Sequence, residues 1–264
     1  MVAEVLRHRA MQKRIGTRKL FHELEPFLCS HGIKMGRDAL FTILSERNLL
    51  VRKRKRRGPA TTLSRHRYKK YPNLVKEFIP LAPNQLWVSD ITYIRVGDKF
   101  AYLSLVTDAY SRKIVGYCLN ESLSAQGPLS ALKMTLAANK SRQGLIHHSD
   151  RGVQYCCDDY ITELQKGKNP ITVSMTEKGD PLENAIAERV NGILKAELLQ
   201  EYYPDYRSAA EELITAVSTY NHLRPHSSIG YLKPVEAHQF SGHLPRKWKN
   251  YYTINKGKEA TVNI

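Results

Sequence analysis

The stretch Leu86-Trp87-Val88-Ser89-Asp90-Ile91-Thr92-Tyr93-Ile94 sets one carboxylate inside an apolar, β-branched and aromatic run. Such a run predicts a buried strand, and a carboxylate there is costly unless it is paired or binds a metal ion. A second acid, Asp150, ends the apolar run that begins at Leu145, and a third, Glu188, lies in a later helical pattern. Three acids that converge would bind two divalent cations, the arrangement that catalyses phosphodiester chemistry.

The segments around this strand predict an α/β fold. Three strands joined by short turns, and therefore antiparallel, come first: residues 86–96, 100–107 and 113–119. A helix over residues 125–139 leads to a fourth strand over 144–148, which the crossover makes parallel to the first. The remaining elements are a helix over 158–166, a strand over 171–175, and helices over 182–200 and 207–222. Together they form a mixed five-stranded sheet flanked by helices.

The predicted topology brings two of the acids together, although each acid also has a simpler explanation. If the first and fourth strands are parallel neighbours, Asp90 and Asp150 meet where the strand order reverses. Alternatively, Asp90 protects a sheet edge and Asp150 caps a turn or helix. Glu188 lies about 200° around its helix from the apolar position Ile186, on a polar stripe with Asn184, Asn191 and Lys195. That stripe faces either solvent or the rim of a site.

The charge of the chain is distributed very unevenly. The net charge is +16, and the first 80 residues hold 20 Lys and Arg against 6 Asp and Glu. The remaining residues hold 21 Lys and Arg against 19 Asp and Glu. This asymmetry predicts an N-terminal arm that binds a polyanion, attached to a nearly neutral body.

Residues 1–50 are predicted to be an all-α region with a helix-turn-helix outline. One helix runs over residues 18–28, with Pro26 weakening its end, and a second runs over 36–47 and carries Arg37. The second helix would enter the DNA major groove, although a simple helical hairpin fits the same pattern. Residues 51–80 are predicted to be a basic linker that begins with Arg52, Lys53, Arg54, Lys55, Arg56 and Arg57. Such a tract is either a solvated connection or a salt-sensitive contact to nucleic acid.

The composition also excludes several classes of protein. The four cysteines show no spacing typical of a zinc site or a disulfide framework. The N-terminal residues lack the apolar core of a signal peptide, and no apolar stretch approaches the ~20 residues that span a bilayer. We therefore expect a soluble, intracellular protein with no membrane partner.

Four ordered motifs resemble those of the DDE transposases of bacterial insertion sequences, the OrfB type with a core like that of retroviral integrases. The motifs are residues 87–93 (WVSDITY), 148–152 (HSDRG), 184–188 (NAIAE) with Leu194-Lys195, and 220–226 (YNHLRPH). The likeness extends from about residue 16 to residue 238. The chain has 37 residues between the second Asp and the Glu where the family usually has 35, and Glu183 where the family usually has Asp.

The resemblance implies an RNase H-like core over residues 81–240, with a C-terminal tail over 241–264. It implies that Asp90, Asp150 and Glu188 bind two Mg²⁺ ions, with Mn²⁺ as a substitute, and act without a covalent protein–DNA intermediate. The implied partners are double-stranded DNA at the element ends and at the target, other copies of the chain bound to DNA, and an upstream protein joined by frameshift fusion. Such a protein is expected in the bacterial cytoplasm, associated with the nucleoid. Lys195, Arg224 and His226 are further candidates for contact with DNA.

Two other classes of function remain open from the sequence. A DNA-binding protein without catalytic activity, or an inactive relic of an element, accounts for the basic arm but not for three intact acids. A nuclease of RNase H type that cleaves RNA–DNA hybrids leaves the first 80 residues without a role.

Overall fold

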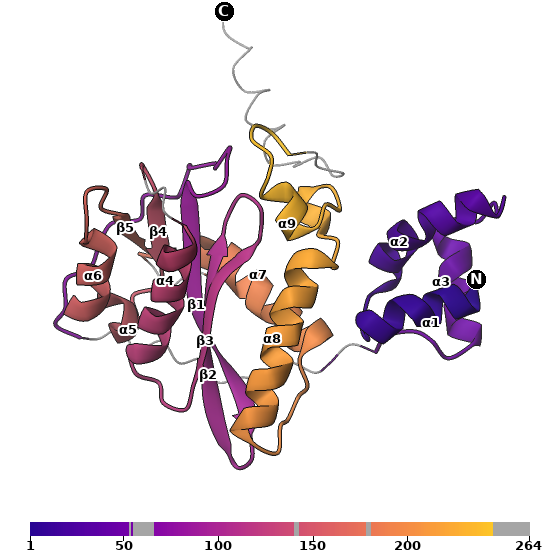
Figure 1. Ribbon diagram of the computed structural model, residues 1–264, viewed down its shortest axis with the longest axis horizontal. Helices are drawn as coiled ribbons and strands as arrows, with labels where there is room; N and C mark the ends of the chain where they lie inside the picture. Colours follow the sequence, from indigo (N-terminus) through magenta and orange to yellow (C-terminus); the bar gives the residue numbers. More distant parts are fainter. Residues whose placement is uncertain (53, 55–65, 140–142, 178–180, 245–264) are drawn as a thin grey trace, which may run out of the picture.

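The computed structural model describes residues 1–52, 54, 66–139, 143–177 and 181–244. An N-terminal group of three helices lies beside a larger body in which helices cover both faces of one sheet (Figure 1). None of the helices in these ranges combines the length and the apolar character needed to cross a bilayer.

The N-terminal helices are α1 (Val2–Met11), α2 (Thr17–Ser30) and α3 (Arg37–Glu46). They enclose a hydrophobic core of their own, which includes Leu20, Leu24, Leu40 and Leu44. Both predicted helices are present, and α1 is an additional helix that the sequence analysis did not predict. Pro26 lies within α2 and does not shorten it. Burial of three leucines of α2, at about 1.5–3 kcal/mol each, outweighs the ~3 kcal/mol cost of an internal proline.

The sheet has the predicted mixed topology. Its five strands lie in the order β3-β2-β1-β4-β5 and are β1 (Leu86–Val96), β2 (Lys99–Asp108), β3 (Ile114–Asn120), β4 (Ile146–Ser149) and β5 (Thr172–Met175). The first three strands are antiparallel, and β4 is parallel to both β1 and β5. Gly97, with a φ of +54°, makes the tight turn between β1 and β2. The crossover helix α4 (Gln126–Ala138) leads from β3 back to the middle of the sheet, which makes β4 parallel to β1.

Helices cover each face of the sheet over a separate core (Figure 1). On one side α4, α5 (Val153–Cys156) and α6 (Asp158–Gln165) enclose Trp87, Leu132 and Tyr160. On the other side α7 (Ala185–Ile193) and α8 (Tyr206–His222) enclose Leu103, Val190 and Leu213. The short helices η3 (Ser227–Ile229) and α9 (Pro234–Ala237) follow α8.

The prediction of one continuous helix over residues 182–200 was wrong. A 3₁₀ turn, η1 (Pro181–Asn184), precedes α7, and a π-turn, η2 (Leu194–Leu198), follows it. In η2 the Leu199 amide donates to the Leu194 carbonyl, 2.8 Å away, which is the wider spacing of a π-helix. The extra residue in this turn lets both Leu194 and Leu199 reach the hydrophobic core.

The second part of the predicted linker, residues 66–80, contacts the edge of the sheet. The Met175 amide donates to the Pro72 carbonyl at 3.2 Å, and the Leu74 amide donates to Ser174 Oγ at 2.9 Å. These bonds cover the outer edge of β5, which would otherwise present unpaired amides to other chains.

Candidate active site

Asp90 and Asp150 come from neighbouring parallel strands at the same level of the sheet. The ladder between β1 and β4 pairs Leu86 with Ile146 and Val88 with His148. The same offset, continued two residues beyond the ladder, pairs Asp90 with Asp150. Since side chains alternate along a strand, both carboxylates project from the face that α7 covers. The prediction that the parallel pairing of β1 and β4 joins these two acids is therefore supported by the register.

The helix that carries Glu188 is attached to β1 by two asparagine side chains. Asn191 Nδ2 donates to Asp90 Oδ2 at 2.8 Å, and Asn184 Nδ2 donates to the Ser89 carbonyl at 2.9 Å. Both asparagines are buried, whereas Glu188 is exposed. The polar stripe of this helix thus lies at a site and does not face only solvent. The sequence analysis placed Asn191 on that stripe but did not identify its bond to the strand acid.

Burial and neighbouring carboxylates dominate the electrostatics of Asp90. Burial and the nearby charge of Asp150 raise the pKa of Asp90 to about 7, with a smaller contribution from Glu188. The bond from Asn191 opposes this rise. Asp150 Oδ1 accepts a hydrogen bond from the Gly152 amide at 3.0 Å, which fixes its orientation.

Mg²⁺ prefers oxygen ligands from carboxylates. The carboxylates of Asp90, Asp150 and Glu188 therefore have the right chemistry to bind a divalent cation. Within the described part of the chain, no group of three or more His, Cys, Asp or Glu side chains is already arranged to hold a metal ion. Asp90, Asp150 and Glu188 therefore lie near one another on the side of the sheet that α7 covers, without forming a closed cluster.

Lys195 extends the site along the strand. Its Nζ lies 3.3 Å from Thr92 Oγ1, on the same face of β1 as Asp90. Partial burial lowers the pKa of Lys195, and the negative charge of Asp90 opposes that effect. A cation is thus held beside the carboxylates.

His147 and His148, next to Asp150, are structural. His148 Nε2 donates to the Glu183 carbonyl at 3.0 Å, so its Nδ1 accepts from Ser174 Oγ at 2.8 Å. Burial lowers the pKa of His147 to about 3. Glu183, the departure from the family pattern, accepts a hydrogen bond from the Glu177 amide at 2.8 Å. Both histidines are therefore neutral near pH 7, and Glu183 holds the turn before α7.

Two predicted DNA contacts, Arg224 and His226, are buried in the structure. Arg224 is 4% exposed and forms a two-bond ion pair with Glu197, at 2.9 and 3.0 Å. His226 is 5% exposed, and burial together with the charge of Arg224 lowers its pKa to about 2. The motif that contains them packs inside the body because α8 ends there against η2.

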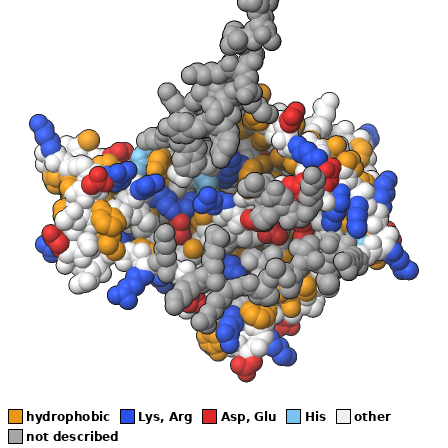
Figure 2. All heavy atoms as spheres, turned by 180° about the vertical axis from the view of Figure 1, so that it is seen from behind, with side chains coloured by type: hydrophobic (Ala, Val, Ile, Leu, Met, Phe, Trp, Pro, Cys, Tyr) orange, Lys and Arg blue, Asp and Glu red, His pale blue; other side chains and the backbone are white. Residues whose placement is uncertain are grey.

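The other predicted contacts have different positions. Arg37 and Arg52 are exposed, and Arg37 pairs with Asp38 at 2.9 Å. Arg54 is half-buried and donates to the carbonyls of Lys195 and Leu199, so it is attached to the body. Lys53, Lys55, Arg56 and Arg57 lie outside the described residues. Lys and Arg side chains are grouped near the middle of the face seen from behind (Figure 2).

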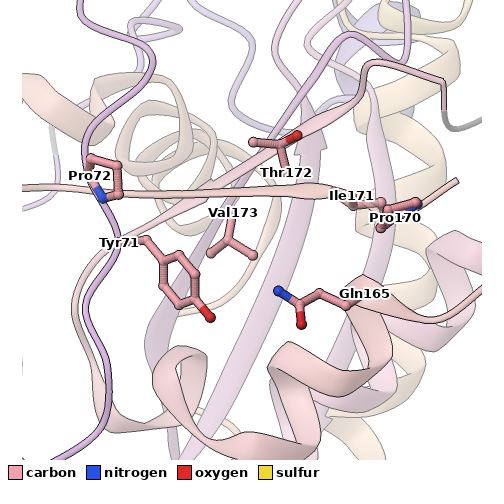
Figure 3. A pocket seen from close by; sticks show the side chains of 7 residues that line it. All are labelled: Tyr71, Pro72, Gln165, Pro170, Ile171, Thr172 and Val173. Carbon is pink, nitrogen blue, oxygen red and sulfur yellow. The ribbon is translucent and has the colours of Figure 1, made fainter.

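A pocket of about 610 Å³ lies elsewhere, at the outer edge of the sheet (Figure 3). It is lined by Tyr71, Pro72, Gln165, Pro170, Ile171, Thr172 and Val173. None of the three acids lines it, so it is separate from the candidate site.

Comparison with known proteins identifies the class. Residues 80–181 match the family model described as integrase core domain, and residues 169–234 match a second model of the same description. The uncharacterized 31 kDa protein of insertion element IS600 from Shigella sonnei is 38% identical over 232 residues, which are 86% of this chain and 82% of that protein. The transposase for insertion sequence element IS629 from Shigella sonnei is 30% identical over 228 residues, 85% of this chain and 74% of that protein.

The chain therefore belongs to the insertion-sequence DDE transposases with an integrase core domain. It is a polynucleotidyl transferase that cleaves DNA and transfers strands in transposition. The simian T-cell lymphotropic virus intasome, in complex with PP2A regulatory subunit B56 gamma, has the same fold at 17% identity. That match has a TM-score of 0.51 and covers 94% of this chain and 78% of that chain. The predicted RNase H-like fold is confirmed.

Proposed function

We propose that Asp90, Asp150 and Glu188 together bind two Mg²⁺ ions, or Mn²⁺ in their place, and that DNA at the ends of an insertion sequence is cut and joined there. The observation that carries the proposal is the shared register of Asp90 and Asp150, with α7 bonded to Asp90 through Asn191. When bound, the two ions would supply Lewis-acid activation of the attacking hydroxyl and stabilisation of the leaving oxygen.

In this proposal, the side chains at the site bind the metal ions, orient a ligand or contact the phosphate. Asp90 and Asp150 supply ligands from the sheet, and Glu188 supplies a ligand from α7. Asn191 orients the Asp90 carboxylate, and Lys195 offers a positive charge to the scissile phosphate. In the reaction a water or a DNA 3′-hydroxyl forms a new O–P bond while the bond to the leaving 3′-oxygen breaks. Each step exchanges one P–O bond for another, so no covalent bond to the protein is required.

We also propose how the chain meets DNA. Residues 1–50 act as a helix-turn-helix region in which α3 and Arg37 contact the element end, and residues 51–80 connect it to the core over 81–240. The exposure of Arg37 and Arg52 supports this assignment. Several copies assemble on DNA, as in the intasome that shares the fold. The chain further acts with an upstream protein joined by frameshift fusion.

The test uses the full chain with double-stranded DNA carrying the ends of the element that encodes it. Replacing Asp90 or Asp150 by Asn, or Glu188 by Gln, should lower Mg²⁺-dependent cleavage by more than the ~10–100-fold typical of residues that only support metal ligands. Asp98→Asn, in the exposed turn after β1, is the matched control and should keep full activity.

Two outcomes would contradict the proposal. DNA binding without cleavage by the wild type would indicate an inactive relic. Cleavage of RNA–DNA hybrids with inert element ends would indicate a nuclease of RNase H type.

A further inference from the structure

The N-terminal helices contact the body at several places, including a hydrogen bond from Gln12 Nε2 to the Leu223 carbonyl at 3.1 Å. Their cations meet the stretch that continues α7. Arg14 Nε donates to the Ala196 carbonyl at 2.9 Å. Lys19 Nζ lies 2.6 and 2.8 Å from the two carboxylate oxygens of Glu197. Arg54, in the segment that follows α3, donates to two further carbonyls of the same stretch, at 2.5 and 2.6 Å. Three cations of the N-terminal arm thus bind residues 195–199.

The π-turn explains why cations gather there. The end of a helix leaves carbonyls without intrahelical partners, and Lys or Arg side chains satisfy them well. The wide turn of η2 presents the carbonyls of Lys195, Ala196 and Leu199, which receive the two arginines. Docking therefore uses carbonyls at the C-terminal end of this helical stretch.

Glu197 is the centre of the junction. It accepts from Lys19 on α2 and from the buried Arg224 after α8, and so links the N-terminal helices to the last long helix of the body. The side chains of Lys19, Glu197 and Arg224 are only 15%, 20% and 5% exposed. Ion pairs as buried as these add little net stability, although removal of one partner leaves the others buried without a counter-charge.

The same stretch is rigidly connected to the candidate active site. Lys195, two residues before Glu197, contacts Thr92 on β1. Asn191, in the preceding turn, is bonded to Asp90. A continuous path of contacts therefore runs from α2 through Glu197 to the carboxylates.

We propose that Glu197 is a positioning residue that fixes the spacing between the DNA sequence held by the N-terminal helices and the phosphodiester bond that is cut. This inference rests on the proposed function of both regions. Glu197 contacts neither DNA nor metal in this scheme. It acts by holding α2 and α7 in one orientation, so that a bound element end presents a single bond to the carboxylates.

The first experiment maps the cleaved bond at single-nucleotide resolution on element-end DNA. Glu197→Gln keeps the shape of the side chain but removes the charge that holds Lys19 and Arg224. We expect cleavage at the original bond to fall roughly 100-fold, because a displacement of about 1 Å costs that much, and cleavage at neighbouring bonds to appear. A role limited to folding would lower cleavage at all bonds alike, and that result would overturn the proposal.

Glu211→Gln is the matched control for this experiment. Glu211 makes an ion pair with Arg207 on the exposed surface of α8, with side chains 65% and 87% exposed. This variant should cut the original bond at the rate of the wild type. A shift of the cut site in the control as well would also overturn the proposal.

The second experiment needs no DNA, so it separates the junction from the proposed function. One spin label is placed on the exposed Cys29 at the end of α2, and another on Lys133→Cys on α4, with Cys118 and Cys157 replaced by serine. The wild type should give one narrow distance distribution, and Glu197→Gln a broad one. A distribution equally narrow in Glu197→Gln would overturn the inference. If the wild type does not cleave DNA, the proposed function is overturned, and the positioning role of Glu197 with it. The spin-label distances would still show whether Glu197 holds the N-terminal helices against the body.

Discussion

At the scale of single residues, two aspartates of the sheet, Asp108 and Asp90, differ in the groups that surround their carboxylates. Asp108 is fully buried, yet it accepts hydrogen bonds from the Asn84 amide at 2.7 Å and from the Ser111 amide at 2.8 Å. Asp90 receives Asn191 but also faces the charge of Asp150. A structural acid and a site acid thus differ in their neighbours and not in their residue type.

The raised pKa of Asp90 predicts a pH-dependent stability. Folding raises this pKa from 3.8 to about 7, so the folded chain binds the proton more tightly than the unfolded chain. Protonation of Asp90 therefore stabilises the folded chain. This contribution to the free energy of unfolding is fully present below pH 4 and is lost as the pH rises through about 7. Without metal, Asp90→Asn should therefore melt above the wild type by on the order of a few degrees at pH 8, but not at pH 4.

Thermal unfolding of the wild type and Asp90→Asn, in the presence of a chelator and between pH 4 and pH 8, measures the difference in melting temperature. At pH 8, Mg²⁺ should reverse the sign of that difference, because only the wild type keeps the full ligand set. The variant Asp98→Asn should show no comparable trend. A melting difference for Asp90→Asn that is constant with pH would contradict the assigned environment.

At the scale of elements, the crossover helix depends on close contact with the sheet. Gly116 on β3 is buried under α4, and a Cβ atom there would lie 2.0 Å from Thr135 Oγ1 and 2.3 Å from the Ala131 carbonyl oxygen. The opposing carbonyl belongs to the helix backbone, so it can move only with the helix. This contact seats the helix that returns the chain to β4 and thereby makes β4 parallel to β1.

Gly116→Ala should accordingly destabilise the chain by about 1–3 kcal/mol or more, as overpacking does. Chemical denaturation followed by fluorescence measures the loss. Gly192→Ala in α7 is the opposite case, because a Cβ atom there meets nothing within 4 Å. It should stabilise the helix by up to about 1 kcal/mol. Equal effects of the two substitutions would contradict the packing described.

At the scale of the whole molecule, part of the N-terminal excess of charge joins the arm to the body. Arg14, Lys19 and Arg54 bind acceptors of the body, so they attach the arm. Lys53, Lys55, Arg56 and Arg57 lie outside the described residues, and the proposed function assigns them, with the exposed Arg52, to phosphate binding.

Replacing those four cations by glutamine, with Arg54 kept, should weaken DNA binding and flatten its salt dependence. If each residue neutralises one phosphate, the slope of log K against log salt should fall by up to about 3.6. Binding titrations over a range of salt concentrations measure the slope. Replacing the exposed Lys166 and Lys168 is the control and should leave it nearly unchanged. An unaltered slope in the fourfold variant would show that the tract does not bind phosphate.

Local pattern was sufficient to predict the strands and most helices. Strand β1 was predicted with its observed bounds, because an alternation of apolar residues ending at a Gly-Asp turn depends only on neighbours in the sequence. The end of α7 at the π-turn η2 was not predictable in this way. It follows from Leu194 and Leu199 both packing into a core built by distant elements.

The sequence by itself determined which residues are acidic, where the sheet forms and how charge divides between arm and body, since each follows from composition and short-range periodicity. Only the tertiary structure decided that Asn191 bonds to Asp90, that Glu197 joins Lys19 to Arg224, and that Arg224 and His226 are interior. The physical reason is that these contacts join elements far apart along the chain. Their energies come from burial and partners that no local pattern records.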